Sequence, residues 1–248
     1  MTGFELHGID HLSASSLNTA AAQLPLWIME RLLKRSAPVG AAAHRGTAIE
    51  AGVQVGLLYP EHEVEKCQDV ALLKYDSLTA LSGDHRREQE REAVQPTVAT
   101  ALAELRQYGI PDEVQFRIEK PLGEGLPPLI GFIDFGWSRH GITLDLKTSL
   151  RLTSDISTAH GRQVAGYVYG TNRQGRVCYA TPKKIGVYPL DRVEERFGEL
   201  VNIAHRLDRF LSISKDPEEL AALVIPDADS FYWSHPTALQ HRREVYGY

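Results

Sequence analysis

The chain has few cysteines, no long apolar run and no excess of basic residues. Two cysteines, Cys67 and Cys178, are too few for a disulfide framework or a four-cysteine metal cluster. They fit a reducing compartment, so we expect two buried or inert thiols. No uncharged apolar stretch is long enough to span a bilayer, and Met1–Asp10 lacks the basic segment and apolar run of a signal peptide. These absences predict a cytoplasmic protein without a membrane partner.

The charge balance is acidic, with a net charge of −5 at pH 7. Proteins that bind DNA without sequence preference are typically basic, so this balance counts mildly against a nucleic-acid partner. It does not exclude one, because clustered carboxylates at a metal centre are offset locally by bound divalent cations.

Several signatures of other protein classes are also missing. There is no Gly-x-x-x-x-Gly-Lys-Ser/Thr phosphate loop, so no ATPase or helicase of that type is fused to the chain. Histidine and cysteine spacings do not match a zinc site, and an iron–sulfur cluster would need more cysteines. A Ser-His-Asp triad is recognised by geometry, so the sequence leaves it open.

What the sequence does contain is a change of hydrophobic period from helix to strand and back. We predict helices over residues 11–34, 46–58, 61–81, 84–108, 157–169, 193–211 and 217–223. We predict strands over residues 114–121, 129–137, 142–148, 176–181 and 185–188. This order favours one α/β domain over residues 1–248, with a three-layer core at about 40–190 and a helical extension at about 191–248.

One charged run allows two interpretations. Residues 84–92 mix both signs, which is typical of an exposed helix face. The alternative is a DNA-binding patch, and we favour the exposed helix start.

The chemically most informative segment is the predicted hairpin of residues 129–148. Asp145 and Lys147 alternate with Leu144 and Leu146, so the charged pair shares one face of its strand while the leucines face the core. Asp134 lies in the apolar preceding strand, where a carboxylate is costly unless it is paired or bound to metal. Paired carboxylates suit Mg²⁺ or Mn²⁺, and a nearby lysine can position water or stabilise a phosphate. The alternative is a structural ion pair of Lys147 with Asp145 or Asp134.

Two further features stand on either side of this hairpin. Glu50 lies beside the apolar stripe of the predicted helix at 46–58. His160, Gln163 and Tyr167 share one face of the helix that follows the hairpin. Each feature alone is ordinary, because exposed glutamates and Gln/Tyr pairs are common on helix surfaces.

In this order, the segments resemble the RecB-type branch of the PD-(D/E)XK nucleases, which includes lambda-type phage exonucleases. The resemblance is carried by five short elements over roughly residues 11–190: residues 11–17, Arg45-Gly46-Thr47 with Glu50, residues 131–134, residues 145–148, and the Gln-x-x-x-Tyr element at 163–167. The acid pair is Asp/Asp and no proline precedes Asp134, a departure that is common in this family.

The resemblance implies a restriction-endonuclease-like core: a small mixed sheet flanked by helices, with helical N- and C-terminal additions. It implies metal ligands at Glu50, Asp134, Asp145 and the Leu146 carbonyl, for one or two Mg²⁺ or Mn²⁺ ions. Lys147 would orient the attacking water. Gln163 and Tyr167 would support the lysine or contact DNA. Further candidates for DNA contact are Ser13, Ser15, Arg45, Thr148 and His160. Helix capping and surface packing are the alternatives for the first three. For His160 the alternatives are an acid or base near the metal and a structural hydrogen bond.

The expected function is therefore metal-dependent DNA hydrolysis, as an exonuclease in recombination or repair in a bacterial or phage-infected cell. The partners would be DNA and a recombination protein such as a single-strand annealing protein. A structure-specific endonuclease and a non-catalytic DNA-end-binding module are the alternatives. Strand polarity, strand preference and a homo-oligomeric state, including a ring, stay open at the sequence level.

Overall fold

The computed structural model describes all 248 residues and is an α/β protein with one five-stranded mixed sheet. The residues form two compact units. Unit 1 contains Met1–Pro38, Ile118–Gly131 and Arg192–Tyr248, and unit 2 contains Val39–Arg117 and Phe132–Asp191. No helix is both long and apolar enough to cross a membrane.

The sheet has the strand order β1-β2-β3-β4-β5, which is also the order along the chain. Its strands are β1 (Glu113–Lys120), β2 (Leu129–Trp137), β3 (Ile142–Thr148), β4 (Gln174–Ala180) and β5 (Ile185–Pro189). β2 and β3 form an antiparallel hairpin, β3 and β4 are parallel, and β4 and β5 are antiparallel. The predicted bounds of the hairpin strands, 129–137 and 142–148, are confirmed.

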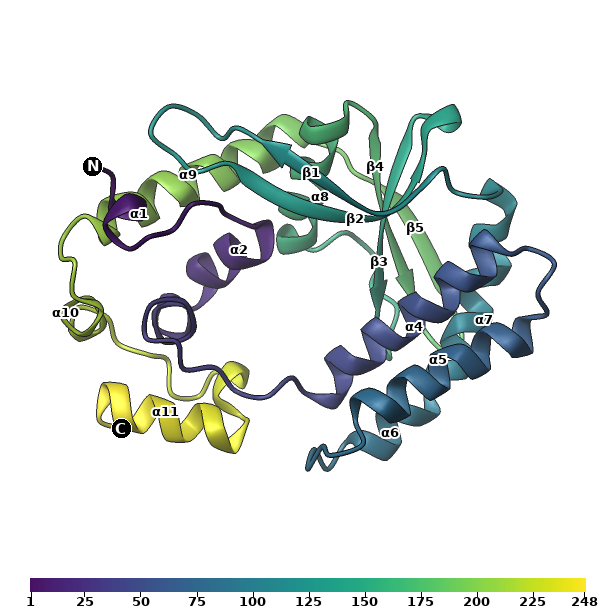
Figure 1. Cartoon of the computed structure of the whole chain (residues 1–248), viewed down its shortest axis with the longest axis horizontal. Helices are drawn as coiled ribbons and strands as arrows, with labels where there is room; N and C mark the ends of the chain where they lie inside the picture. The colour runs from purple at the N-terminus through teal and green to yellow at the C-terminus, as the bar shows by residue number, and fades with distance from the viewer. The chain divides into compact units, whose positions relative to one another are not determined.

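Two helices of unit 2, α4 (Ala41–Leu58) and α7 (Val94–Leu105), pack on one face of this sheet, and α5 (Val64–Leu78) packs on both of these helices. They lie side by side in Figure 1. Their apolar residues share a core with Phe135, Trp137, Leu144 and Leu146, together with Cys178 of β4. The core placement of the β3 leucines agrees with the predicted alternation.

The helix α8 (Thr158–Thr171) joins β3 to β4 and packs against both strands. Its Val164 and Val168 lie so close to Gly175 of β4 that an added Cβ would come within 2.4 and 2.7 Å of their side chains. Gly175 and Cys178 are three positions apart on β4, so they lie on opposite faces of the sheet. Cys178 faces the core that includes α4 and α7, so α8 covers the other face. Asp145 and Lys147 therefore project from β3 on the α8 face.

Unit 1 combines the two ends of the chain with the internal segment Ile118–Gly131. Its helices include α1 (Gly3–Leu6), α2 (Ala14–Ala22), α3 (Leu24–Trp27), α9 (Val193–Leu211), α10 (Pro217–Ala222) and α11 (Pro236–Tyr246). Phe4, Leu17 and Trp27 share a core with Leu200 and Leu207 of α9. Near the C-terminus, Trp233 is buried against Leu26 and Met29, whereas Phe231 and Tyr232 are exposed.

The single helix predicted over residues 11–34 is wrong. The structure has α2, then α3, then a π-helical turn at Ile28–Leu32. Gln23 ends α2 with φ −149° and ψ 70°, and Pro25 occupies the first turn of α3. Proline lacks the N–H that would continue a helix, so the backbone breaks before it.

The single helix predicted over residues 84–108 is also wrong. It divides into α6 (Arg87–Glu92), α7 and a 3₁₀ turn at Arg106–Tyr108. Pro96 explains the restart at Val94, because proline is tolerated only in the first turn of a helix.

The interpretation of residues 84–92 as an exposed face is wrong for two acids. The side chain of Asp84 is 8% exposed and that of Glu90 6%. Each of these side chains has a basic partner, Arg86 for Asp84 and Arg45 for Glu90, and Asp84 also accepts two backbone N–H groups.

Candidate active site

The hairpin β2–β3 brings the two aspartates together. Its register pairs Phe135 with Leu144, and one further step along both strands sets Asp134 opposite Asp145. At this step the Asp134 side chain takes a hydrogen bond from the next strand, because the N–H of Leu146 donates to Asp134 Oδ2 at 2.6 Å. Asp134 is thereby fixed across the hairpin while its Oδ1 faces other partners.

Asp145 and Lys147 form an ion pair on β3. Lys147 Nζ lies 2.8 Å from Asp145 Oδ2, and Asp145 is only 2% exposed. Apart from the Lys147 ammonium group, this buried Oδ2 has no hydrogen-bond partner, so it keeps acceptor capacity for a further ligand. The ion pair expected as the structural alternative is present, and the interpretation of the site depends on what surrounds it.

A third carboxylate, Glu50 of α4, reaches the same place from another element. Gln115 of β1 joins it to the hairpin: its Nε2 donates to Glu50 Oε1 and, at 3.0 Å, to Asp134 Oδ1. Gln115 was not predicted from the sequence as part of the site. Its backbone has φ +47°, in the left-handed region that a non-glycine residue enters at a cost of about 1–2 kcal/mol.

The three acids influence one another through charge. Burial and then the charges of Asp145 and Glu50 raise the pKa of Asp134 well above its usual value. Burial and then Asp145 raise the pKa of Glu50. Burial opposes the charge of Lys147, but Asp145, with Asp134 and Glu50, outweighs burial and raises the pKa of its ammonium group. The centre therefore holds more negative charge than its lysine compensates.

The Gln163 and Tyr167 side chains meet on α8 as their spacing predicts. Gln163 Nε2 donates to the Tyr167 hydroxyl at 2.6 Å. Tyr167 is 4% exposed, and burial together with the charge of Asp145 raises the pKa of its phenol, which keeps the hydroxyl protonated. This pair thus belongs to the electrostatic surroundings of Asp145.

His160, at the start of α8, contacts Tyr179, which was not predicted from the sequence as a site residue. The Tyr179 hydroxyl lies 2.7 Å from His160 Nδ1 and also accepts the N–H of Ser157. Burial and then the positive charge of Lys147 lower the pKa of His160, so the neutral imidazole is favoured. Tyr179 lies opposite Lys147 in the β3–β4 register, which accounts for its position.

Arg45 and Thr148, two candidates for DNA contact, are joined to each other. Arg45 is 6% exposed, and its guanidinium donates to Glu90 and, at 3.3 Å, to the Thr148 carbonyl oxygen. The structure thus shows Arg45 in an internal ion pair that ties α4 and α6 to the end of β3. Its contact with DNA stays a prediction.

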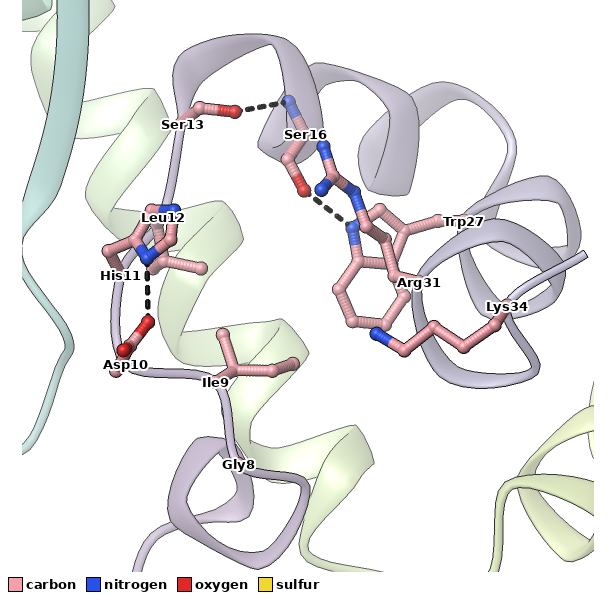
Figure 2. Close-up of a pocket in the computed structure, with 10 residues that line it drawn as sticks. All are labelled: Gly8, Ile9, Asp10, His11, Leu12, Ser13, Ser16, Trp27, Arg31 and Lys34. Atoms are coloured by element: carbon pink, nitrogen blue, oxygen red, sulfur yellow. Dashed lines mark hydrogen bonds and ion pairs between the residues drawn. The ribbon is translucent and has the colours of Figure 1, made fainter. Parts of the chain in front are cut away.

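Ser13 and Ser15, the remaining candidates, belong to unit 1. Ser13 Oγ accepts the N–H of Ser16 and caps α2, as its sequence context predicts. Ser13 also lines a pocket of about 220 Å³ (Figure 2), around which the cationic side chains of Arg31 and Lys34 are arranged. The phosphate contacts of Ser13 and Ser15 stay predictions.

The donor set at the hairpin suits a hard divalent cation. It offers the carboxylates of Glu50, Asp134 and Asp145, and one Asp145 oxygen has acceptor capacity to spare. The structure does not arrange three or more His, Cys, Asp or Glu side chains as a finished metal site. The Leu146 backbone donates its N–H to Asp134, and ligation by its carbonyl stays a prediction.

Comparisons with known proteins add little to this geometry. No family model matches the chain, and no curated protein is found to be similar to it. Among solved structures, one described as "Crystal structure of SSO0001" is 15% identical, covers 73% of this chain and 82% of that chain, and has a TM-score of 0.36. At that level the likeness carries no argument about function.

Proposed function

We propose that this protein is a metal-dependent deoxyribonuclease with a restriction-endonuclease-like core. The observation that carries the proposal is the convergence of Glu50, Asp134, Asp145 and Lys147 at the β2–β3 hairpin. A structural ion pair needs one acid for one lysine, whereas this centre gathers three acids around Lys147 and leaves their repulsion only partly compensated.

Each side chain has a defined part in the proposed hydrolysis of a phosphodiester bond. Glu50, Asp134 and Asp145 would hold one or two Mg²⁺ or Mn²⁺ ions, which supply Lewis-acid activation of the phosphate and of water when bound. Lys147, kept charged by Asp145, would orient the attacking water and stabilise negative charge on the phosphate. The hydroxyl of Tyr167, held by Gln163, would support Asp145 and Lys147 from α8.

The first prediction concerns cleavage by variants of the ion pair. Asp145→Asn removes a carboxylate and Lys147→Ala removes the ammonium group, so each should lower the Mn²⁺- or Mg²⁺-dependent cleavage rate at least about 100-fold, the lower range for loss of such a group. The measurement is a time course on end-labelled linear DNA. Glu65→Gln, which changes an exposed carboxylate on α5, is the matched control and should cleave at the wild-type rate.

Circular DNA provides the second arm of this experiment. Release of nucleotides from linear DNA alone indicates an exonuclease, which we propose on the family resemblance, whereas cleavage of circles indicates the endonuclease alternative. Wild-type protein that retains DNA but cleaves neither substrate would be a non-catalytic binding module. That result, or undiminished cleavage by both variants, contradicts the proposed function.

A further inference from the structure

The carboxylates of Glu50 and Asp134 are bridged by an amide. Gln115 Nε2 donates to Glu50 Oε1 and to Asp134 Oδ1. A primary amide carries two N–H groups, so this one nitrogen satisfies both carboxylates at once. The nitrogen therefore stands between two acids that repel each other, which is the place that a cation would be expected to take.

The backbone of Gln115 is specialised for this contact. β1 runs from Glu113 to Lys120, and Gln115 has φ +47° inside it. In a regular strand the side chains alternate between the two faces, and a left-handed residue redirects its own side chain. Strained non-glycine residues persist where the surrounding structure requires them, and they concentrate at functional sites.

We propose that Gln115 is a positioning residue whose amide takes the place of a divalent cation between Glu50 and Asp134, and that it must be displaced when the cation binds. The inference rests on the proposed function, because it takes these two acids to be metal ligands. An amide is neutral and compensates the repulsion of the acids only in part, whereas a divalent cation compensates it fully. Replacement of the amide by the cation is therefore favourable. Loss of the Gln115 hydrogen bonds subtracts from the free energy of cation binding.

The test is Mn²⁺ binding to the full chain by isothermal titration calorimetry. Hydrogen bonds to charged groups are strong enough that losing this bridge should tighten Mn²⁺ binding about tenfold in Gln115→Ala. Gln115→Gly should tighten it equally, because it also lacks the amide. Gln95→Ala, which removes an amide that donates to Asp69 on the surface of α5, should leave Mn²⁺ affinity unchanged.

Thermal unfolding gives an independent readout of the same exchange. Without metal, Gln115→Ala should melt below the wild type, and Gln115→Gly should melt above Gln115→Ala because glycine tolerates the positive φ. With Mn²⁺, both variants should gain more stability than the wild type, since tighter binding gives a larger shift. A purely structural amide would lower the melting temperature without enlarging the Mn²⁺ response.

The possible results distinguish failure of the proposed role of Gln115 from failure of the proposed nuclease function. Unchanged Mn²⁺ affinity in Gln115→Ala, with Mn²⁺ bound by the wild type, overturns the inference alone. Weaker binding also overturns it, because it would make the Gln115 oxygen a ligand. A wild-type protein that binds no Mn²⁺ and cleaves no DNA overturns the inference and the proposed function together.

Discussion

Asp84 caps the N-terminus of α4 although it lies far from this helix in the sequence. The N-terminal residue of α4 follows Gly40, which has no side chain to cap the helix. Asp84 supplies the missing acceptor, because its Oδ2 takes the N–H of Ala41 at 2.9 Å while its Oδ1 takes the N–H of Arg86 at 3.0 Å. α4 carries Glu50, so this distant cap also fixes the helix that brings an acid to the candidate site.

The second prediction follows from the charge of this cap. Asp84→Asn should lower the free energy of unfolding at pH 7 by about 1–3 kcal/mol, the range for a helix cap and a hydrogen bond to a charged group. Hydrogen bonds from Arg86 and from the Ala41 N–H hold the pKa of Asp84 well below its usual value. Its contribution is therefore present above about pH 4 and is lost as the pH falls.

Urea unfolding at several pH values checks this dependence. The difference between wild type and Asp84→Asn should narrow as the pH falls below about 4. Asp69→Asn, an exposed carboxylate on α5, is the control and should stay close to the wild type throughout. Equal stability of Asp84→Asn and wild type at pH 7 would show that the distant cap contributes nothing.

The sequence predicts only part of the site at this scale. Asp134, Asp145 and Lys147 lie on one hairpin, so strand alternation alone places them together. The contact of Gln115 with Glu50 joins residues 65 positions apart and depends on a left-handed backbone that glutamine does not signal. The buried pairing of Arg45 with Glu90 was missed for a similar reason, because a mixed charge run is usually exposed.

The helix α4 packs closely against α5 and α7 at two of its glycines. A Cβ at Gly52 would lie 2.6 Å from the Cys67 carbonyl oxygen of α5, and one at Gly56 would lie 2.6 Å from a Leu102 methyl of α7. Backbone cannot yield as easily as the end of a leucine side chain. The two positions therefore set the spacing of the helix layer behind the sheet.

The third prediction compares alanine at three glycines of the same helix. Gly52→Ala should destabilise the protein by about 1–3 kcal/mol through overpacking, and Gly56→Ala by less. Gly46→Ala is the matched control: its Cβ would meet only Thr148 Oγ1 at an ordinary 3.5 Å, so the better helix propensity of alanine should stabilise slightly. Thermal unfolding measures all three, and a Gly52→Ala variant as stable as Gly46→Ala would contradict the proposed close packing.

Elements with a strong local pattern were predicted well. The bounds of β2, β3 and α9 agree with the sequence prediction, because alternation or an apolar stripe continues over each full length. The helices predicted over 11–34 and 84–108 were too long, since their apolar spacing continues through Pro25 and Pro96 while the backbone breaks just before each.

At the scale of the whole molecule, the two compact units are interleaved along the chain. Unit 1 is completed by contacts such as that of the Phe4 N–H with Asp208 Oδ1, 204 positions apart, and that of the Tyr246 hydroxyl with the Pro25 carbonyl oxygen. The sequence shows no linker at which one unit gives way to the other. Long-range contacts of this kind, together with a shared apolar core, join the segments of unit 1, and local sequence patterns do not reveal them.

Both cysteines lie in unit 2 and report on its folding. Cys67 and Cys178 are buried and free, as the sequence predicts. They contribute to the same core, against α4 and α7. Burial raises the pKa of both thiols, so the reactive thiolate is scarce at neutral pH in the folded protein.

The fourth prediction is that neither thiol reacts with a disulfide reagent such as DTNB until unit 2 opens. At pH 8 the native protein should react at well under one tenth of the rate of the protein in urea, because the thiols are both inaccessible and protonated. Cys67→Ser and Cys178→Ser each leave one reporter, and the two single thiols should become reactive over the same range of urea, since they share one core. The control is circular dichroism on the same samples, which must show that each serine variant is folded before urea is added. Rapid labelling of either thiol in the native state, or exposure of one well before the other, would mean that α5 and the sheet do not unfold as one body.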